Sequence, residues 1–124
     1  MCVGPGGLRF DNFIAELTRN HFVGSWHFSP QQPNVSVGQT FVALNTGGEE
    51  HTFTEVKQFG GGIIPLLNQL SGNPIETPEC AALEEDDRVQ PGGRYEEEIT
   101  EAGTMKVQCC IHPWMRLEAR VSPQ

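Results

Sequence analysis

Three side chains that can bind a soft metal ion lie close together near the end of the chain, and they restrict how it can fold. They are Cys109, His112 and Met115, each three residues after the one before. All three can reach one point only if the chain turns tightly between two extended segments. Pro113 stiffens such a turn, because its ring fixes φ and it lacks a backbone donor. The spacing therefore predicts a loop that joins two strands.

Most of the chain has the pattern of short strands separated by turns. Glycine and proline make up 23 of the 124 residues, and no apolar run is long enough to span a bilayer. Apolar and polar residues alternate over short stretches, as in half-buried strands. These stretches cover residues 26–29, 35–37, 41–45, 51–56, 95–99, 105–109 and 117–121. We expect an all-β protein, a Greek-key β-sandwich of seven or eight strands.

Two segments depart from this pattern. Phe10, Phe13, Ile14 and Leu17 are spaced as on one face of a helix. We expect residues 1–24 to be an N-terminal extension with an amphipathic helix at about 10–21 that covers one end or face of a sheet. Residues 25–124 would form the main domain. Its long connection, about 58–93, contains a flexible Gly60–Gly62 joint and, at 63–70, a short helix or a packed loop.

The chemistry of the three side chains favours copper. A thiolate, an imidazole and a thioether together suit both Cu(I) and Cu(II). A fourth ligand must come from elsewhere in the chain. His51 opens a strand after the Gly47–Gly48 turn, where its side chain could reach the end of a neighbouring strand. We therefore predict a single copper ion at His51, Cys109, His112 and Met115.

Residues 26–122 resemble a cupredoxin, the blue-copper family that includes plastocyanin, amicyanin and azurin. The similarity lies in residues 35–41, in Asn45 to Phe53, and in the short C-x-x-H-P-x-M loop, which is most similar to the amicyanin form. The resemblance implies one type 1 copper and electron transfer outside the cytoplasm. It implies His51, Cys109 and His112 as equatorial ligands and Met115 as the axial one. It also implies a solvent-exposed His112 edge that serves as the electron's path.

The remaining cysteines and histidines leave alternatives open. Cys109 and Cys110 are adjacent, and side chains of successive strand residues point to opposite faces, so only one can face the metal. The spacing to His112 favours Cys109. Cys110 either pairs with Cys80 or stays a free thiol. A zinc site of Cys80, Cys109, Cys110 and His112 is a weaker reading. His21 and His27 are expected to lie outside the metal site.

The charge of the chain bears on its partners. The net charge is −8, and residues 49–124 carry all of it. Residues 76–101 hold ten acidic groups against two arginines, so a nucleic-acid partner is excluded on charge. We expect a redox partner protein to dock at Trp114 and His112 or on the acidic 76–101 region. The alternative for the acidic region is a solvated surface that keeps the protein soluble.

Two other functions and a location complete the expectations. Besides a one-electron carrier that is not an enzyme, the chain could deliver copper or act as an accessory copper domain of an oxidase complex. No His-x-His pair occurs, which argues against a trinuclear catalytic cluster. We expect an exported, periplasmic or extracytoplasmic protein. No signal peptide is visible, and one explanation is that the chain starts after its signal was removed. Cys2 would then suit a lipid anchor; the alternative is a thiol at a frayed terminus or a disulfide partner. The sequence does not determine the oligomeric state.

Overall fold

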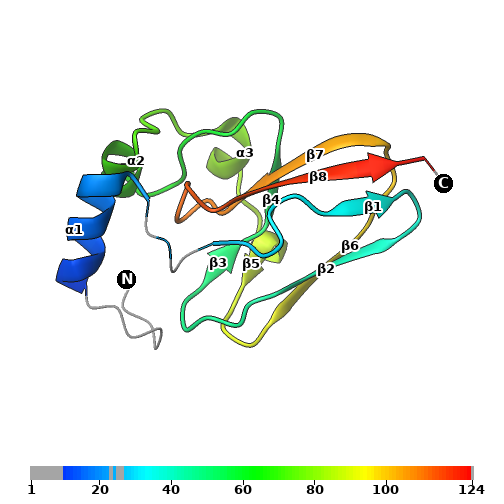
Figure 1. The fold of residues 1–124 in the computed structure, drawn as a ribbon, viewed down its shortest axis with the longest axis horizontal. Coiled ribbons are helices and arrows are strands. Elements are labelled where there is room, and N and C mark those ends of the chain that lie inside the picture. Colours follow the sequence, from blue (N-terminus) through cyan, green and yellow to red (C-terminus); the bar gives the residue numbers. More distant parts are fainter. Residues whose placement is uncertain (1–9, 23, 25–26, 124) are drawn as a thin grey trace.

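The part of the chain that the structure describes folds into eight strands, with two of the helices together at one end. The computed structural model describes residues 10–22, 24 and 27–123. The strands are β1 (Asn34–Ser36), β2 (Thr40–Leu44), β3 (His51–Thr52), β4 (Thr54–Val56), β5 (Arg88–Val89), β6 (Arg94–Glu98), β7 (Gly103–Gln108) and β8 (Arg116–Ser122). The helices are α1 (Phe10–Asn20), α2 (Pro65–Ser71), α3 (Pro78–Ala81) and the 3₁₀ turn η1 (Glu85–Asp87). Figure 1 shows α1 and α2 together at the end of the molecule opposite the C-terminus.

The strands form one larger sheet and two pairs. The larger sheet has the order β1-β8-β7-β4, with β1 parallel to β8 and the other neighbours antiparallel. β2 pairs with β6, and β3 pairs with β5, both antiparallel. Along β8 every second residue is buried, as expected for a strand with one face on the core. These inward residues, Leu117, Ala119 and Val121, share one core cluster with Phe53, between β3 and β4, and Val89 of β5.

Most predicted strands are present, with some differences. The predicted strand at 51–56 is divided into β3 and β4 at Phe53, whose N–H donates instead to the Asp87 carbonyl at 2.9 Å. The strand predicted at 26–29 is not found at His27 or Phe28, and Trp26 lies outside the described residues. The sequence did not predict β5, because a strand of two residues is too short to show the alternation of apolar and polar side chains.

The long connection is more ordered than the sequence suggested. α2 begins at Pro65, as proline favours the first helical turn. Gly72, at φ 78°, ends it in the left-handed region where glycine is favoured. Gly60–Gly62 is not a flexible joint, and that prediction was wrong. A Cβ on Gly62 would collide with the Cys110 carbonyl oxygen, and the Ile63 N–H donates to the same oxygen at 2.7 Å.

The predicted N-terminal helix is present as α1, over Phe10–Asn20. Phe13 and Leu17 are fully buried and belong to a second core cluster with Leu67 of α2, Cys109 and Met115. The helix thus covers an end of the sheet, at the loop between β7 and β8. No helix in the described part of the chain is long and apolar enough to cross a bilayer.

Candidate metal centre

Three donor atoms converge at the end of the sheet that α1 covers. The Cys109 sulfur lies 3.9 Å from His51 Nδ1 and 3.8 Å from His112 Nδ1. Together these side chains form a group whose ligand atoms all lie within 4.8 Å of one another. Such a spacing is close enough for one metal ion to contact a thiolate and two imidazoles.

The fold brings these residues together from two places in the chain. His51 opens β3, and Cys109 directly follows β7. The loop after Cys109 is held by two backbone bonds: Met115 N–H donates to the His112 carbonyl at 2.9 Å, and Cys109 N–H to the Met115 carbonyl at 3.0 Å. Thr52 connects the two segments, because its hydroxyl oxygen accepts from Cys110 N–H at 2.7 Å.

The Cys109 sulfur is buried and receives hydrogen bonds from backbone N–H groups. Thr52 N–H lies 3.3 Å from the sulfur and Ile111 N–H 3.4 Å. Burial raises the pKa of the Cys109 thiol above its usual range, because a thiolate loses hydration, while the backbone donors lower it. A positive ion beside the sulfur would reverse this balance, since a coordinating thiol is deprotonated. The site therefore suits a thiolate that forms when a metal is bound.

Both histidines are kept neutral. Burial, with a smaller contribution from the neighbouring His51, lowers the pKa of His112 to about 3. Burial also lowers the pKa of His51, although the Glu50 carboxylate opposes this. A neutral imidazole has a free nitrogen lone pair, which is the form that binds metals. At neutral pH both rings are thus ready to act as ligands.

A carboxylate that the sequence analysis missed lies beside this pair. Glu49 Oε2 is 3.8 Å from His112 Nε2. Since His112 is neutral, the contact is not an ion pair. Glu49 can instead orient the ring, as outer carboxylates do for metal-bound histidines. Its position in the sequence, two residues before His51, did not indicate that it would lie beside His112.

The expected exposure of His112 is wrong. Its side chain has no exposed surface, whereas the resemblance implied an open edge at the protein surface. The Phe13 ring of α1 packs against it at 6.3 Å between centroids, and the Trp114 ring lies 5.5 Å away. The N-terminal helix, which precedes the residues that resemble a cupredoxin, supplies part of this cover through Phe13.

The other candidate residues are also placed. Met115 is buried and packs in the same cluster as Cys109. Cys110 forms a disulfide with Cys80, which settles the alternative left open by the sequence. The weaker zinc reading fails, because those two sulfurs are not available as thiolates. His21 and His27 each direct Nδ1 to a backbone carbonyl, of Leu70 and Gly24, and lie outside the metal group. Cys2 lies outside the described residues.

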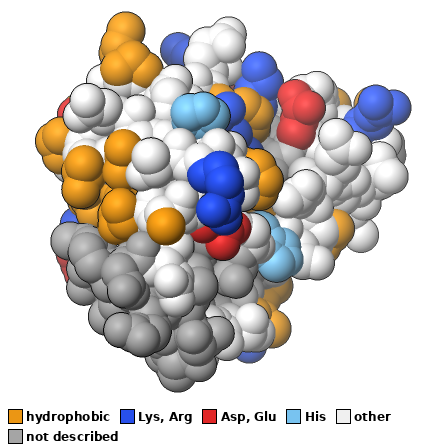
Figure 2. All heavy atoms as spheres, turned by 60° about the vertical axis from the view of Figure 1, so that its left-hand side comes forward, with side chains coloured by type: hydrophobic (Ala, Val, Ile, Leu, Met, Phe, Trp, Pro, Cys, Tyr) orange, Lys and Arg blue, Asp and Glu red, His pale blue; other side chains and the backbone are white. Residues whose placement is uncertain are grey.

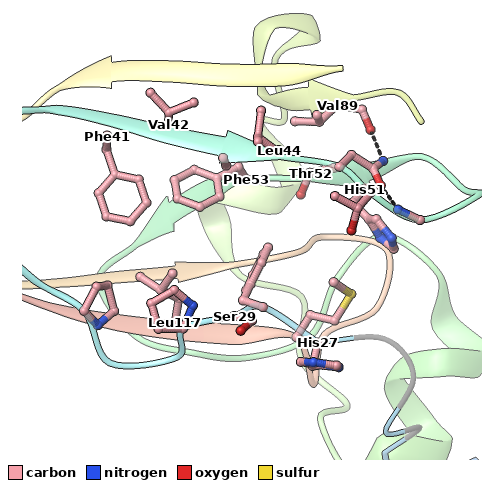
Figure 3. Close-up of a pocket in the computed structure, with 18 of the residues that line it drawn as sticks. His27, Ser29, Phe41, Val42, Leu44, His51, Thr52, Phe53, Val89 and Leu117 are labelled. Carbon is pink, nitrogen blue, oxygen red and sulfur yellow. Dashed lines mark hydrogen bonds between the residues drawn. The ribbon is translucent and has the colours of Figure 1, made fainter. Parts of the chain in front are cut away.

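A cavity of about 620 Å³ lies between the two layers and reaches the metal group. Its lining includes both His51 and Met115. Figure 3 shows Phe41 and Phe53 pointing into this space, with Leu117 on the opposite side and His51 at one end. The metal group therefore borders open space on its His51 side and packed side chains on its His112 side.

Comparison with solved structures identifies the fold. A purple cupredoxin from Nitrosopumilus maritimus is 22% identical and has a TM-score of 0.58, over 81% of this chain and 86% of that one. A reduced amicyanin variant is 21% identical with a TM-score of 0.53, over 81% and 77% of the two chains. Another amicyanin variant, in its Cu(I) form, is 21% identical with a TM-score of 0.52, over 82% and 77%. The sequence matches no protein-family model and no curated protein.

These likenesses agree with the chemistry of the donor set. The site here offers one cysteine sulfur and two neutral imidazoles. Soft sulfur with imidazole nitrogen in a buried position suits a single type 1 copper ion. The chain has the cupredoxin fold, with a His–Cys–His group that fits one type 1 copper ion.

Proposed function

We propose that the protein is a one-electron carrier in which His51, Cys109, His112 and Met115 would hold a single type 1 copper ion. The observation that carries this proposal is the approach of two histidine Nδ1 atoms to within 3.9 Å of one buried cysteine sulfur. When bound, the copper supplies the redox chemistry, by gaining and losing one electron between Cu(II) and Cu(I). The chain is then a carrier and not an enzyme.

The residues around the site perform three tasks in this proposal. Burial of His112 and Cys109 excludes water from their side of the site. The backbone donors on the Cys109 sulfur stabilise its negative charge and so influence the reduction potential. Thr52 and the loop's backbone bonds fix the positions of the ligands, so that little has to move when the charge changes.

Burial of the site favours a carrier over a copper-delivery protein. A delivery protein needs an exposed, exchangeable site, but here Cys109, His112 and Met115 are all buried. An accessory role in an oxidase complex would use the same site and remains the second candidate. We also propose that the strands are connected as a Greek-key β-sandwich.

The location proposed from the sequence is outside the cytoplasm. The Cys80–Cys110 disulfide supports it, because such bonds persist in oxidising compartments. The lipid anchor at Cys2 and the division of the chain at about residue 24 remain part of this proposal.

Copper titration tests the proposed function. One equivalent of Cu(II) added to the copper-free protein should produce an intense visible thiolate-to-copper band that disappears on reduction. His51→Ala should weaken binding strongly and change the spectrum. The matched control, His27→Ala, removes an exposed histidine outside the group and should bind copper like the parent. Equal behaviour of the two variants would contradict the proposal.

A further inference from the structure

The two histidines of the metal group differ in how they meet the surface. His112 is buried, and its ring contacts the rings of Phe13 and Trp114. Its Nε2 lies 3.8 Å from an oxygen of Glu49, whose side chain is itself largely buried. A partner protein could therefore not touch this ring without displacing α1. Phe13 is fully buried in that position, so displacement would cost the burial of a whole aromatic side chain.

His51 has the opposite arrangement. Its Nδ1 faces the Cys109 sulfur, and its Nε2 faces Gly47. A Cβ on Gly47 would lie 3.8 Å from His51 Nε2, so the glycine backbone is next to the ring and no side chain intervenes. Gly47 is exposed, and His51 is half-buried. The outer edge of His51 thus lies just below the surface, under a residue that has no side chain.

The loop that carries Gly47 is held firmly in place. Asn45 is buried, and its side-chain amide donates to the carbonyls of Val89 at 2.8 Å and Glu49 at 2.6 Å. Its side-chain oxygen accepts from Gly47 N–H at 3.0 Å. Figure 3 shows His51 beside these bonds. The opening over His51 is therefore a fixed feature of the surface, which we call the Gly47 window.

The surroundings of the window combine an exposed apolar side chain with paired charges. Leu44, at the end of β2, lines the same cavity as Gly47 and His51 and is 66% exposed. Its cross-strand partner is Arg94. Glu50, next to His51 in the chain, forms an ion pair with Arg88 at 2.8 Å. Such a surface matches a partner that presents an apolar contact.

We propose that electrons enter and leave the site through His51, and that the Gly47 window is the docking surface for a redox protein that presents an apolar contact. In each transfer the reduced site gives up one electron, the oxidised partner accepts it, and no bond forms or breaks. This inference rests on the proposed function. Docking on the helical end of the molecule, where hydrophobic side chains gather (Figure 2), is the competing outcome.

Chemical modification of the copper-free protein tests the window directly. Diethyl pyrocarbonate acylates accessible neutral imidazoles, and the chain has four histidines. We expect modification at His51 and protection at His112, with the exposed His21 and His27 as internal standards. Gly47→Phe should protect His51, whereas Gly47→Ala, which adds only a Cβ in ordinary contact, should not. Modification of His112 ahead of His51 would overturn the inference.

Electron transfer to a small cation provides the second test. The probe is the tris(phenanthroline)cobalt(III) cation, which oxidises the copper-loaded protein. Leu44→Lys should slow this reaction about tenfold, because the new charge repels the probe at the window. Leu66→Lys, a matched change of an exposed leucine on α2, should leave the rate unchanged. Gly47→Phe should slow it as well, relative to Gly47→Ala.

The outcomes separate this inference from the proposed function. A protein that shows the thiolate-to-copper band but is slowed by Leu66→Lys, and not by Leu44→Lys or Gly47→Phe, overturns the window and leaves the carrier function intact. A protein without that band overturns the carrier function, and electron exit through His51 with it.

Discussion

The Phe13 ring stands edge-on to the His112 ring, with 6.3 Å between their centroids and 72° between their planes. This contact joins the N-terminal helix to the metal group. It also means that a histidine which the cupredoxin resemblance implied to be exposed is instead part of the core. The stability of the fold and the accessibility of the site should therefore depend on the same side chain.

Truncation of Phe13 should show this dependence. Phe13→Ala removes a fully buried ring and should lower the free energy of unfolding by about 3 kcal/mol. The control is Phe22→Ala, because that ring is 50% exposed and should matter little. Urea unfolding of the copper-free proteins measures both. Equal stability of Phe13→Ala and the parent would show that α1 does not cover the site.

The stability of the copper-free protein should fall in acid because of His112. Its pKa is about 3 in the folded state against an ordinary value of 6.5, so only the unfolded chain binds a proton between these values. The free energy of unfolding then decreases by about 1.4 kcal/mol for each unit of falling pH in this window, from this residue alone.

Comparison with a variant isolates that contribution. Acidic residues also titrate as the pH falls, so the unfolding free energies of the parent and His112→Asn are compared at each pH. The parent should show the steeper decline between about pH 6.5 and about pH 3. Parallel curves would mean that His112 is protonated in the folded protein.

The Cys80–Cys110 disulfide should stabilise the fold of the long connection, residues 58–93, without taking part in copper binding. Cys80→Ser combined with Cys110→Ser removes a link between residues 30 positions apart and should lower the free energy of unfolding by about 3 kcal/mol. The thiolate-to-copper band should persist in the folded double variant, because only Cys109 is a proposed ligand. Loss of the band at a temperature where the variant is folded would assign the metal to Cys110.

Glycine at position 62 should be far less replaceable than glycine at position 47. A Cβ on Gly62 collides with the Cys110 backbone, so Gly62→Ala should destabilise the protein by about 3 kcal/mol. A Cβ on Gly47 meets only ordinary contacts at 3.5 and 3.8 Å, so Gly47→Ala should be close to neutral. Thermal unfolding compares the two variants. Similar melting temperatures would contradict the packed arrangement of residues 60–62.

The sequence predicted the features that depend on local spacing. Cys109, His112 and Met115 lie in one tight loop, so their spacing predicted both the turn and its chemistry. The alternation along residues 117–121 predicted β8, and the helical spacing of Phe13 and Leu17 predicted α1. The opposite faces of successive strand residues predicted that only one of the adjacent cysteines faces the metal, and the spacing to His112 favoured Cys109.

The features that were missed depend on contacts between distant segments. Helical spacing shows that Phe13 faces a core, but not that the core includes His112. The Gly60–Gly62 run suggested flexibility. Glycine also occurs where two backbone segments approach closely, and composition alone does not distinguish the two cases. Glu49 reaches His112 only because the loop after Asn45 folds back under its own hydrogen bonds.

The most direct test of the account is the visible spectrum of the Cu(II)-loaded protein compared with that of Cys109→Ser. Serine keeps the shape of the site but replaces the thiolate sulfur with oxygen. We predict an intense thiolate-to-copper band in the parent, at one copper per chain, that is absent in Cys109→Ser. A colourless copper complex of the parent, or a variant that binds copper with the same spectrum, would contradict a type 1 copper site at His51, Cys109 and His112.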